Sequence, residues 1–161
     1  MNEELKFNLK ICDSLGEACE DANIIQESAP EDINIKRSVH HDIEENSPND
    51  ALIVSSSSGL LPTNIQEGLK FPERFAIGHP FNPVYILPLV EIVGGKLTSQ
   101  STIESLRDFY TSIKMHPLIV RNEIEGYLSD RLQEAQWREI LHLVNDDIAT
   151  TRELDEAIMY G

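Results

Sequence analysis

The chain has 161 residues, of which 40% are hydrophobic, and its 28 acidic and 13 basic residues give a formal net charge of −15. This length is sufficient for a domain with a real hydrophobic core. The acidic charge argues against nucleic acid or an anionic membrane as a partner. No apolar run reaches the roughly 20 residues that a membrane-spanning helix needs. Residues 1–4 lack the basic opening of a signal peptide, so we expect a cytoplasmic protein.

The spacing of apolar residues predicts alternating helices and strands up to about residue 120, which is typical of an α/β fold. Ala51–Val54 is a short apolar run typical of a buried parallel strand, and the serines Ser55–Ser58 follow it directly. Active residues in open α/β sheets lie at the carboxyl ends of strands. The other strands are expected at 23–27, 75–77, 87–93 and 116–120, and the helices at 15–19, 28–46, 65–69 and 101–113.

The helix expected from residue 28 to residue 46 has an apolar stripe at four-residue spacing. Ile35, Val39 and Ile43 form this stripe, which predicts the buried face of the helix. His40 and His41 fall on the polar face, and we expect no function for either residue.

The character of the chain changes after residue 126, where helical patterns replace the alternation. Ser101–Glu104 and Thr150–Glu153 both have the form of a capping box, which predicts two helix starts. Long helical patterns cover 127–144 and 154–160. We therefore divide the chain into a frayed start at 1–14, a partial α/β domain at 15–122 and a partial α-helical domain at 123–161.

The potential metal ligands of the chain are scattered. Its five histidines and its two cysteines, Cys12 and Cys19, show no metal-ligand spacing with one another or with carboxylates. We expect two reduced thiols and no metal site.

One histidine and one carboxylate lie twelve positions apart, each beside an apolar stretch that reads as a strand. They are His79 and Glu91, and the loop between them is rich in proline. A buried glutamate is costly unless it is paired, so we expect His79 as its partner, with Arg74 and Arg121 as rivals. A carboxylate held against one imidazole nitrogen leaves the other nitrogen as a base near neutral pH. The pair is suited to taking a proton from a hydroxyl.

The same segment resembles a known family. GHPFNPVYILPLVEIVGG, together with GYLSDRLQEAQWREILHLVNDDIATT downstream, resembles the L-3-hydroxyacyl-CoA dehydrogenase superfamily and within it the L-carnitine 3-dehydrogenase branch. The resemblance covers about Leu15 to Gly161. It implies NAD-dependent oxidation of a 3-hydroxy group to a 3-oxo group, with L-carnitine as the substrate. It also implies the C-terminal part of a Rossmann-like NAD-binding domain, followed by the first helices of an all-α domain that forms a homodimer.

The resemblance assigns roles to individual residues. It makes His79 the general base, oriented by Glu91, and it makes Ser58 the serine that hydrogen-bonds the substrate hydroxyl. Asn82 matches a residue that lines the same site. The cofactor NAD would supply the hydride chemistry, while the protein supplies a base, orientation and a dry pocket.

Two further positions match residues on the nicotinamide side of the cofactor. These are Glu31 and Lys36. The family also has a strand, a GxGxxG turn and a helix that binds the pyrophosphate. The eight glycines of this chain never fall in that spacing. We therefore expect the second half of a nucleotide-binding domain.

Asp130 occupies a position at which the acyl-CoA enzymes have an asparagine, in the motif GFxxNR. A carboxylate there suits a cationic substrate such as a trimethylammonium compound. The alternative is an ion pair within the helix, for example with Arg131. Aromatic side chains would add cation–π contacts of about 0.5–2 kcal/mol each. The candidates are Tyr85, Tyr127 and Trp137.

Three functions follow from these observations. The first is an NAD-dependent dehydrogenase of L-carnitine. The second is a 3-hydroxyacyl-CoA dehydrogenase of fatty acid metabolism, or another hydroxy-acid member such as the gulonate dehydrogenase branch. The third is a non-catalytic remnant, or a subunit that depends on a partner for the missing glycine turn.

Overall fold

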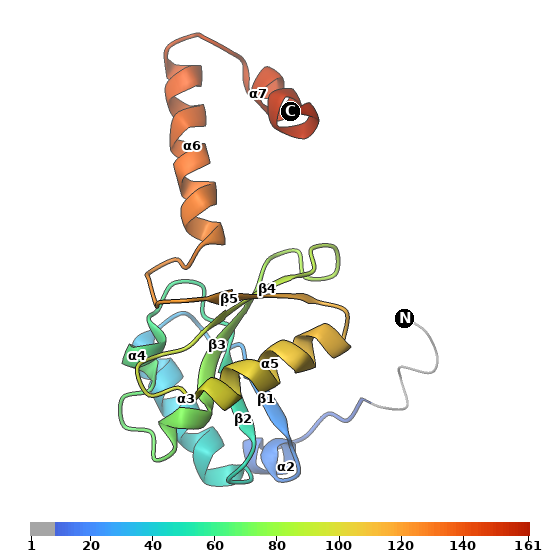
Figure 1. The fold of residues 1–161 in the computed structure, drawn as a ribbon, viewed down its shortest axis with the longest axis vertical. Coiled ribbons are helices and arrows are strands. Elements are labelled where there is room, and N and C mark those ends of the chain that lie inside the picture. The colour runs from blue at the N-terminus through green and yellow to red at the C-terminus, as the bar shows by residue number, and fades with distance from the viewer. Residues whose placement is uncertain (1–8) are drawn as a thin grey trace.

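The computed structural model describes residues 9–161 and contains one five-stranded sheet (Figure 1). The spatial order of the strands equals their order in the chain. The first three strands are mutually parallel, the fourth is antiparallel to the third, and the fifth is parallel to the fourth. The strands are β1 (Ile24–Glu27), β2 (Leu52–Ser55), β3 (Phe75–Pro80), β4 (Leu89–Val93) and β5 (His116–Val120).

Helices cover both faces of the sheet, and its three inner strands, β2, β3 and β4, are largely buried. Neighbouring residues of one strand belong to different cores: Ile53 packs with the core that includes α2, α3 and α4, and Val54 packs with the core under α5. Strands buried on both faces read as continuous apolar runs, as 51–54 does. The helices are α2 (Leu15–Cys19), α3 (Ile33–Asn46), α4 (Pro62–Ile65), α5 (Gln100–Ser112), α6 (Ser129–Asn145) and α7 (Thr151–Tyr160), with a 3₁₀ turn at Pro72–Arg74.

A helix or strand lies at or next to each predicted position, but among the helices only α2 begins at the predicted residue. α6 begins at Ser129 and α7 at Thr151, in place of residues 127 and 154. α3 begins at Ile33 because the Asp32 side chain accepts hydrogen bonds from two backbone N–H groups and caps the helix there. α4 begins at Pro62, three residues before the predicted start, and α5 is capped by Ser99 in place of Ser101. The capping box at Thr150 and Glu153 is confirmed.

The buried face of α3 differs from the predicted stripe. Ile35 is 43% exposed, whereas Lys36 and His40 are at most 1% exposed. Glu44 is also buried, and its carboxylate accepts the backbone N–H groups of residues 70 and 71. The prediction that His40 lies on an exposed polar face was therefore wrong. Polar side chains can occupy this face because each finds a partner inside the protein.

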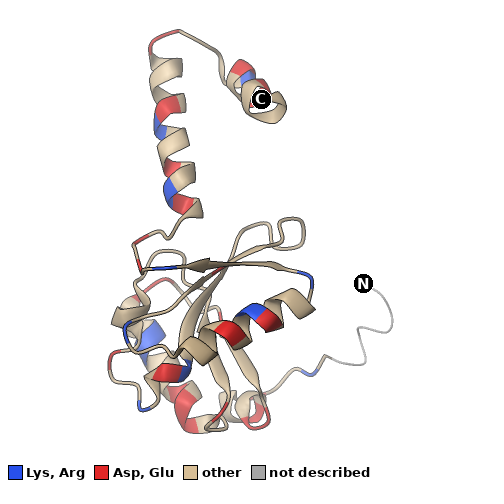
Figure 2. Cartoon of the chain, viewed as in Figure 1, with Lys and Arg blue, Asp and Glu red and all other residues tan. Residues whose placement is uncertain are grey.

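The last two helices project from the α/β body. Figure 1 shows α6 rising from the sheet and α7 turning away at its far end, and neither helix contains a buried residue. Figure 2 shows acidic and basic side chains interspersed along α6. No helix in the described part of the chain is long and apolar enough to cross a membrane.

Candidate active site

The predicted histidine–glutamate pair is present at the centre of the sheet. His79 of β3 stands directly opposite Glu91 of β4 in the antiparallel register. The His79 Nδ1 and Glu91 Oε2 atoms are 3.0 Å apart, and the two residues are 4% and 0% exposed. Because an ionised carboxylate can only accept, Nδ1 donates this hydrogen bond, and in the neutral tautomer that it selects the lone pair is on Nε2. The arrangement is that of an oriented general base.

The second oxygen of Glu91 is held by the start of α6. Glu91 Oε1 accepts the backbone N–H groups of Leu128 at 2.9 Å and Ser129 at 3.0 Å. Burial alone would raise the pKa of Glu91, but the hydrogen bonds from His79 and from these two N–H groups outweigh burial and lower the pKa. Glu91 therefore stays ionised beside the imidazole.

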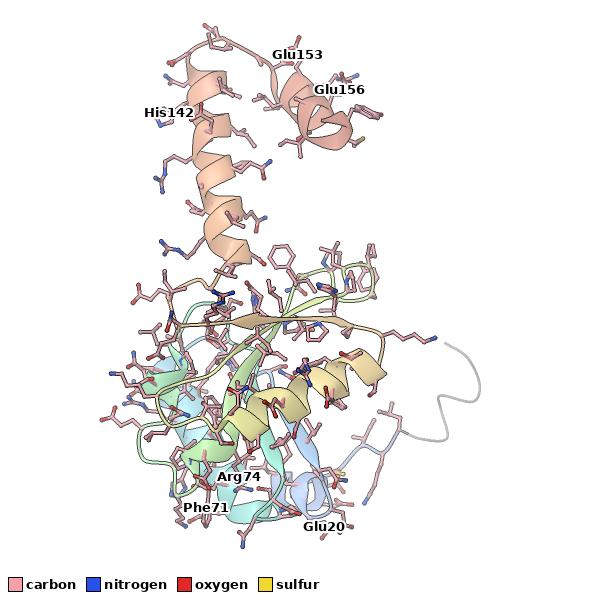
Figure 3. The ribbon with its side chains drawn as sticks, viewed as in Figure 1. Glu20, Phe71, Arg74, His142, Glu153 and Glu156 are labelled. Carbon is pink, nitrogen blue, oxygen red and sulfur yellow. The ribbon has the colours of Figure 1, made fainter. Side chains whose placement is uncertain are left out.

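The rival partners of Glu91 lie elsewhere. Arg74 donates hydrogen bonds to the carbonyls of Pro48 and Ala51, and its guanidinium stands 5.5 Å from the centre of the Phe71 ring. Figure 3 shows Arg74 and Phe71 together at the end of the body remote from α6. Arg121 is exposed.

Four of the predicted site residues line one cavity of about 210 Å³. They come from the loop after β2, the end of β3 with its following loop, and the first turn of α6. Two residues that the sequence did not single out complete the lining. The full set is Ser58, His79, Phe81, Asn82, Asp130 and Gln133.

Glu31 organises the serine loop next to this cavity. Its Oε1 atom accepts the Ser57 hydroxyl at 2.5 Å and the backbone N–H groups of Ser58 and Gly59 at 3.1 and 3.0 Å. Burial would raise the pKa of Glu31, but these hydrogen bonds and the nearby charge of Lys36 lower it. The loop that presents Ser58 is thus built around a carboxylate.

Lys36 belongs to a buried cluster that the sequence did not predict. Its ammonium lies 3.0 Å from Glu27 Oε1 and 3.6 Å from Glu31 Oε2. Glu27 also accepts hydrogen bonds from His40 at 3.0 Å and from Ser55 at 2.6 Å. Burial opposes ionisation of Glu27, but His40, Ser55 and Lys36 outweigh it and lower its pKa to about 2. The sequence feature that could have indicated this cluster is the lysine and the histidine four positions apart on α3, which lie on the same face of the helix.

The three aromatic residues considered for cation–π contacts lie outside this cavity lining. Tyr127 is fully buried, its ring centre is 5.5 Å from that of His79, and its hydroxyl donates to the Leu60 carbonyl at 2.8 Å. Tyr85 is 88% exposed. Trp137 lines a neighbouring hollow on α6, which shares Asp130 and Gln133 with this cavity. Phe81 is the aromatic residue of the cavity, with its ring centre 6.3 Å from that of His79.

Asp130 forms no ion pair with another residue of the described chain, 9–161. The neighbouring Arg131 instead donates to the carbonyl of Glu125 at 3.3 Å. Asp130 therefore brings an uncompensated carboxylate to the same cavity as His79. No cluster of three or more potential metal-ligating side chains was found in residues 9–161.

The fold and this site define a class of protein. The chain has parallel strands whose carboxyl ends present a serine loop and a carboxylate-oriented histidine, as expected for the catalytic edge of a nucleotide-dependent dehydrogenase. Residues 2–124 match the family model of the 3-hydroxyacyl-CoA dehydrogenase NAD-binding domain. The chain belongs to the 3-hydroxyacyl-CoA dehydrogenase family.

The relatives of this chain are enzymes of about twice its length. It is 51% identical to the L-carnitine dehydrogenase of Oceanobacillus iheyensis over 97% of this chain and 51% of that protein. It is 53% identical to the L-carnitine dehydrogenase of Bacillus cereus over 99% of this chain and 48% of that protein. The chain therefore spans about half the length of the curated relatives it matches.

Solved structures share the fold. An NAD⁺-dependent 5-formyl-3-hydroxy-2-methylpyridine 4-carboxylic acid 5-dehydrogenase superposes with a TM-score of 0.87 and 31% identity, over 93% of this chain and 48% of that one. A 3-hydroxyacyl-CoA dehydrogenase of Archaeoglobus fulgidus superposes with a TM-score of 0.77 and 25% identity, over 88% of this chain and 48% of that one. The expected Rossmann-like α/β fold, with helices following it, is confirmed.

Proposed function

We propose that this chain carries the proton-abstracting half of an NAD-dependent dehydrogenase that oxidises L-carnitine to 3-dehydrocarnitine. The observation that supports the proposal most is the His79–Glu91 pair at the wall of a small polar cavity. The L-carnitine dehydrogenases at about half identity point to the same reaction.

Each residue of the cavity then has a chemical task. Nε2 of His79 takes the proton of the substrate hydroxyl, and the Glu91 carboxylate stabilises the imidazolium that forms. Ser58 and Asn82 hold the reacting oxygen by hydrogen bonds. The cofactor NAD, when bound, supplies the hydride acceptor.

The residues at the carboxyl ends of β1 and β2 fit the nicotinamide end of such a cofactor. We propose that Glu31, whose side chain is 43% exposed, contacts the cofactor directly. The Lys36 side chain is only 1% exposed and is bound to Glu27, so it would act by fixing the position of Glu31.

The shape of carnitine favours Asp130 and Phe81 as the groups that recognise its cation. One methylene separates the carbinol carbon from the quaternary nitrogen, so the cation lies two bonds, roughly 2.5 Å, from the reacting carbon. The cation must therefore occupy the cavity of His79 itself. Trp137 is seven residues beyond Asp130 on α6, about 10 Å further along the helix. A cation–π contact with Phe81 would contribute about 0.5–2 kcal/mol.

A substrate panel tests this assignment. NADH formation should be measured with L-carnitine, D-carnitine and 3-hydroxybutyryl-CoA at equal concentrations. The proposal expects L-carnitine to be oxidised at least tenfold faster than either competitor, a difference of about 1.4 kcal/mol in transition-state binding. Preference for 3-hydroxybutyryl-CoA would favour the acyl-CoA dehydrogenase alternative, and no turnover with any substrate would favour the non-catalytic one.

One structural feature supports the partner-dependent alternative. In residues 9–161, β1 has β2 as its only strand neighbour. Asn23 and Glu27 bond to β2, so the backbone groups of Ile24 and Gln26 between them point to the open edge. Beside this edge is a groove of about 340 Å³, lined by residues of α2, β1 and α3. A strand–turn–helix unit pairing along β1 would complete the cofactor site.

Titration of NADH fluorescence with this chain separates the two cases. If the site needs a further unit along β1, binding should be weak, with a dissociation constant in the millimolar range, because the glycine turn for the pyrophosphate is missing from the sequence. Micromolar binding by the chain alone would contradict the partner-dependent alternative.

The projecting helices support a dimer. We propose that 123–161 forms a partial helical domain through which two copies associate, because several large apolar side chains on α6 and α7 are exposed. Sedimentation equilibrium would show a species of twice the monomer mass, and a monomer at all concentrations would contradict it. The exposed apolar residues include Leu132, Trp137, Leu141, Ile158 and Met159.

A further inference from the structure

Tyr127 is buried where three elements of the candidate site meet. Its hydroxyl donates to the carbonyl of Leu60 at 2.8 Å, in the loop that presents Ser58. Its ring centre lies 5.5 Å from that of His79, and the two rings meet at 61°. The residue is 0% exposed. It therefore contacts both the serine loop and the base.

The backbone at Tyr127 connects these contacts to α6. Gly126 and Tyr127 have φ angles of 70° and 45°, so both lie in the left-handed region. That region is unfavourable for a tyrosine, and a residue remains there only when surrounding contacts hold it. The next two residues, Leu128 and Ser129, donate their N–H groups to Glu91. Asp130 follows them directly. Tyr127 thus fixes the turn from which the first residues of α6 reach the cavity.

We propose that Tyr127 is a positioning residue, whose hydroxyl locks the Ser57–Leu60 loop to the start of α6 and so keeps Ser58, His79 and Asp130 in register across the cavity. This role rests on the proposed function, because it concerns the site that would carry out the oxidation. It assigns Tyr127 no proton transfer. Burial raises the pKa of Tyr127 far above its ordinary value, so the hydroxyl remains a protonated donor.

A matched pair of variants isolates the contribution of this hydroxyl. Tyr127→Phe removes the oxygen and keeps the ring beside His79. Tyr110→Phe is the control, because Tyr110 is also buried and its hydroxyl also donates to one acceptor, Gln26, in the core under α5. Both variants lose one buried phenol hydroxyl, so any general loss of stability should be similar in the two proteins.

Hydrogen exchange of individual amides, followed by NMR, is the first measurement. The amides of Ser58 and Gly59, which Glu31 binds in the folded protein, should exchange about tenfold faster in Tyr127→Phe, as expected when one net hydrogen bond closing the loop is lost. Tyr110→Phe should leave them within twofold of the wild type. Equal exchange at these amides in all three proteins would overturn the proposal.

Two further measurements distinguish positioning from a merely structural role. The imidazole resonances of His79 should shift clearly more in Tyr127→Phe than in Tyr110→Phe, although Gln26, the acceptor of Tyr110, donates to the carbonyl of Gly78 next to His79. 4-Aminophenylalanine at position 127 retains an N–H donor and should restore the slow exchange of Ser58 and Gly59. Failure of this rescue, or identical His79 spectra in all variants, would overturn the proposal. None of these measurements requires turnover, so a failure of the proposed oxidation would be seen separately in the substrate panel.

Discussion

Two buried histidine–glutamate pairs in this molecule have the same distance between their hydrogen-bonded atoms, but only one of the two histidines lines a cavity. His79 and Glu91 are 3.0 Å apart, as are His40 and Glu27. His79 binds its carboxylate through Nδ1 and lines a cavity, whereas His40 binds through Nε2 and is fully buried. The Nδ1 atom of His40 has no hydrogen-bond partner within residues 9–161. A pair of this kind can serve catalysis only where the second ring nitrogen reaches a substrate.

The companions of the two glutamates differ in the same way. The other hydrogen-bond partners of Glu91 are two uncharged backbone N–H groups at the start of α6. Its negative charge is therefore available to stabilise the imidazolium that forms when His79 takes a proton. The other partners of Glu27 are the ammonium of Lys36 and the hydroxyl of Ser55, so the positive charge of Lys36 already compensates its carboxylate. We infer that the first pair serves chemistry and that the second joins β1, β2 and α3.

The largest expected effect comes from replacing each histidine with asparagine. The asparagine amide can mimic Nδ1, so His79→Asn keeps a donor to Glu91 and removes only Nε2, the base. NADH formation from L-carnitine should fall by about 10²–10⁴-fold, the usual contribution of a general base. The free energy of unfolding should change by less than about 1 kcal/mol.

His40→Asn is the matched control and should show the opposite result. Asparagine at position 40 cannot replace Nε2, so Glu27 loses a buried donor and stability should fall by about 1–3 kcal/mol. Turnover should stay within a few-fold of the wild type at a temperature where the variant is folded. Equal losses of turnover in the two variants would remove the distinction between the pairs.

Replacing each glutamate with glutamine compares how much the two carboxylates contribute to the free energy of unfolding. Glu27→Gln leaves the buried Lys36 without its full counter-charge and should cost about 3–5 kcal/mol, as for other broken buried ion pairs. Glu91→Gln retains an oxygen to accept the two N–H groups of α6 and should cost about 1–3 kcal/mol. Urea unfolding of both variants measures the difference, and a larger cost at Glu91 would contradict this account of the Glu27 cluster.

The acid sensitivity of folding should also come in part from the Glu27 cluster. The ordinary glutamate pKa of 4.5 applies to the unfolded chain, and the folded protein lowers it at Glu27 to about 2. Between these values the unfolded state binds more protons, so stability is lost as the pH falls from about 4.5 towards 2. Glu27→Gln should flatten this decline. Parallel melting-temperature curves for variant and wild type between pH 5 and pH 2.5 would show that Glu27 does not contribute.

The contact between His79 and Glu91 could be predicted from the sequence, whereas the contact between His40 and Glu27 could not. His79 and Glu91 sit beside apolar stretches joined by a short loop, so a simple hairpin-like register brings them together. The buried face of α3 was predicted only in part, because Ile43 of the apolar stripe is buried but the other three buried positions are polar. Lys36 and His40 are buried because they bind Glu27 of the neighbouring strand β1. The spacing of apolar residues within one helix cannot predict such a contact with another element.

Contacts between distant segments also explain the remaining errors at the site. Tyr127 was considered for a cation–π contact with the substrate, yet it is fully buried and its hydroxyl reaches Leu60, sixty-seven positions earlier in the chain. Phe81 was overlooked although it lies within the histidine motif itself, since only the cavity distinguishes it from Tyr85. The placement of Ser58 and Asn82 beside His79 followed the family resemblance, and the cavity lining is consistent with it.

The smallest expected effect concerns Asp130, which lines the cavity next to His79. His40 is fully buried and lines no such cavity in residues 9–161. Asp130→Asn removes the carboxylate proposed to attract the carnitine cation and should lower kcat/KM for L-carnitine about fivefold, the value of a partly exposed ion pair of about 1 kcal/mol. For 3-hydroxybutyrate, which lacks the cation, kcat/KM should be unchanged or higher. Glu134→Gln provides the control, because it removes the same charge one turn further along α6 and outside this cavity. If both variants lower kcat/KM for carnitine equally, the effect reflects the general negative field of α6, and Asp130 has no special role in choosing the substrate.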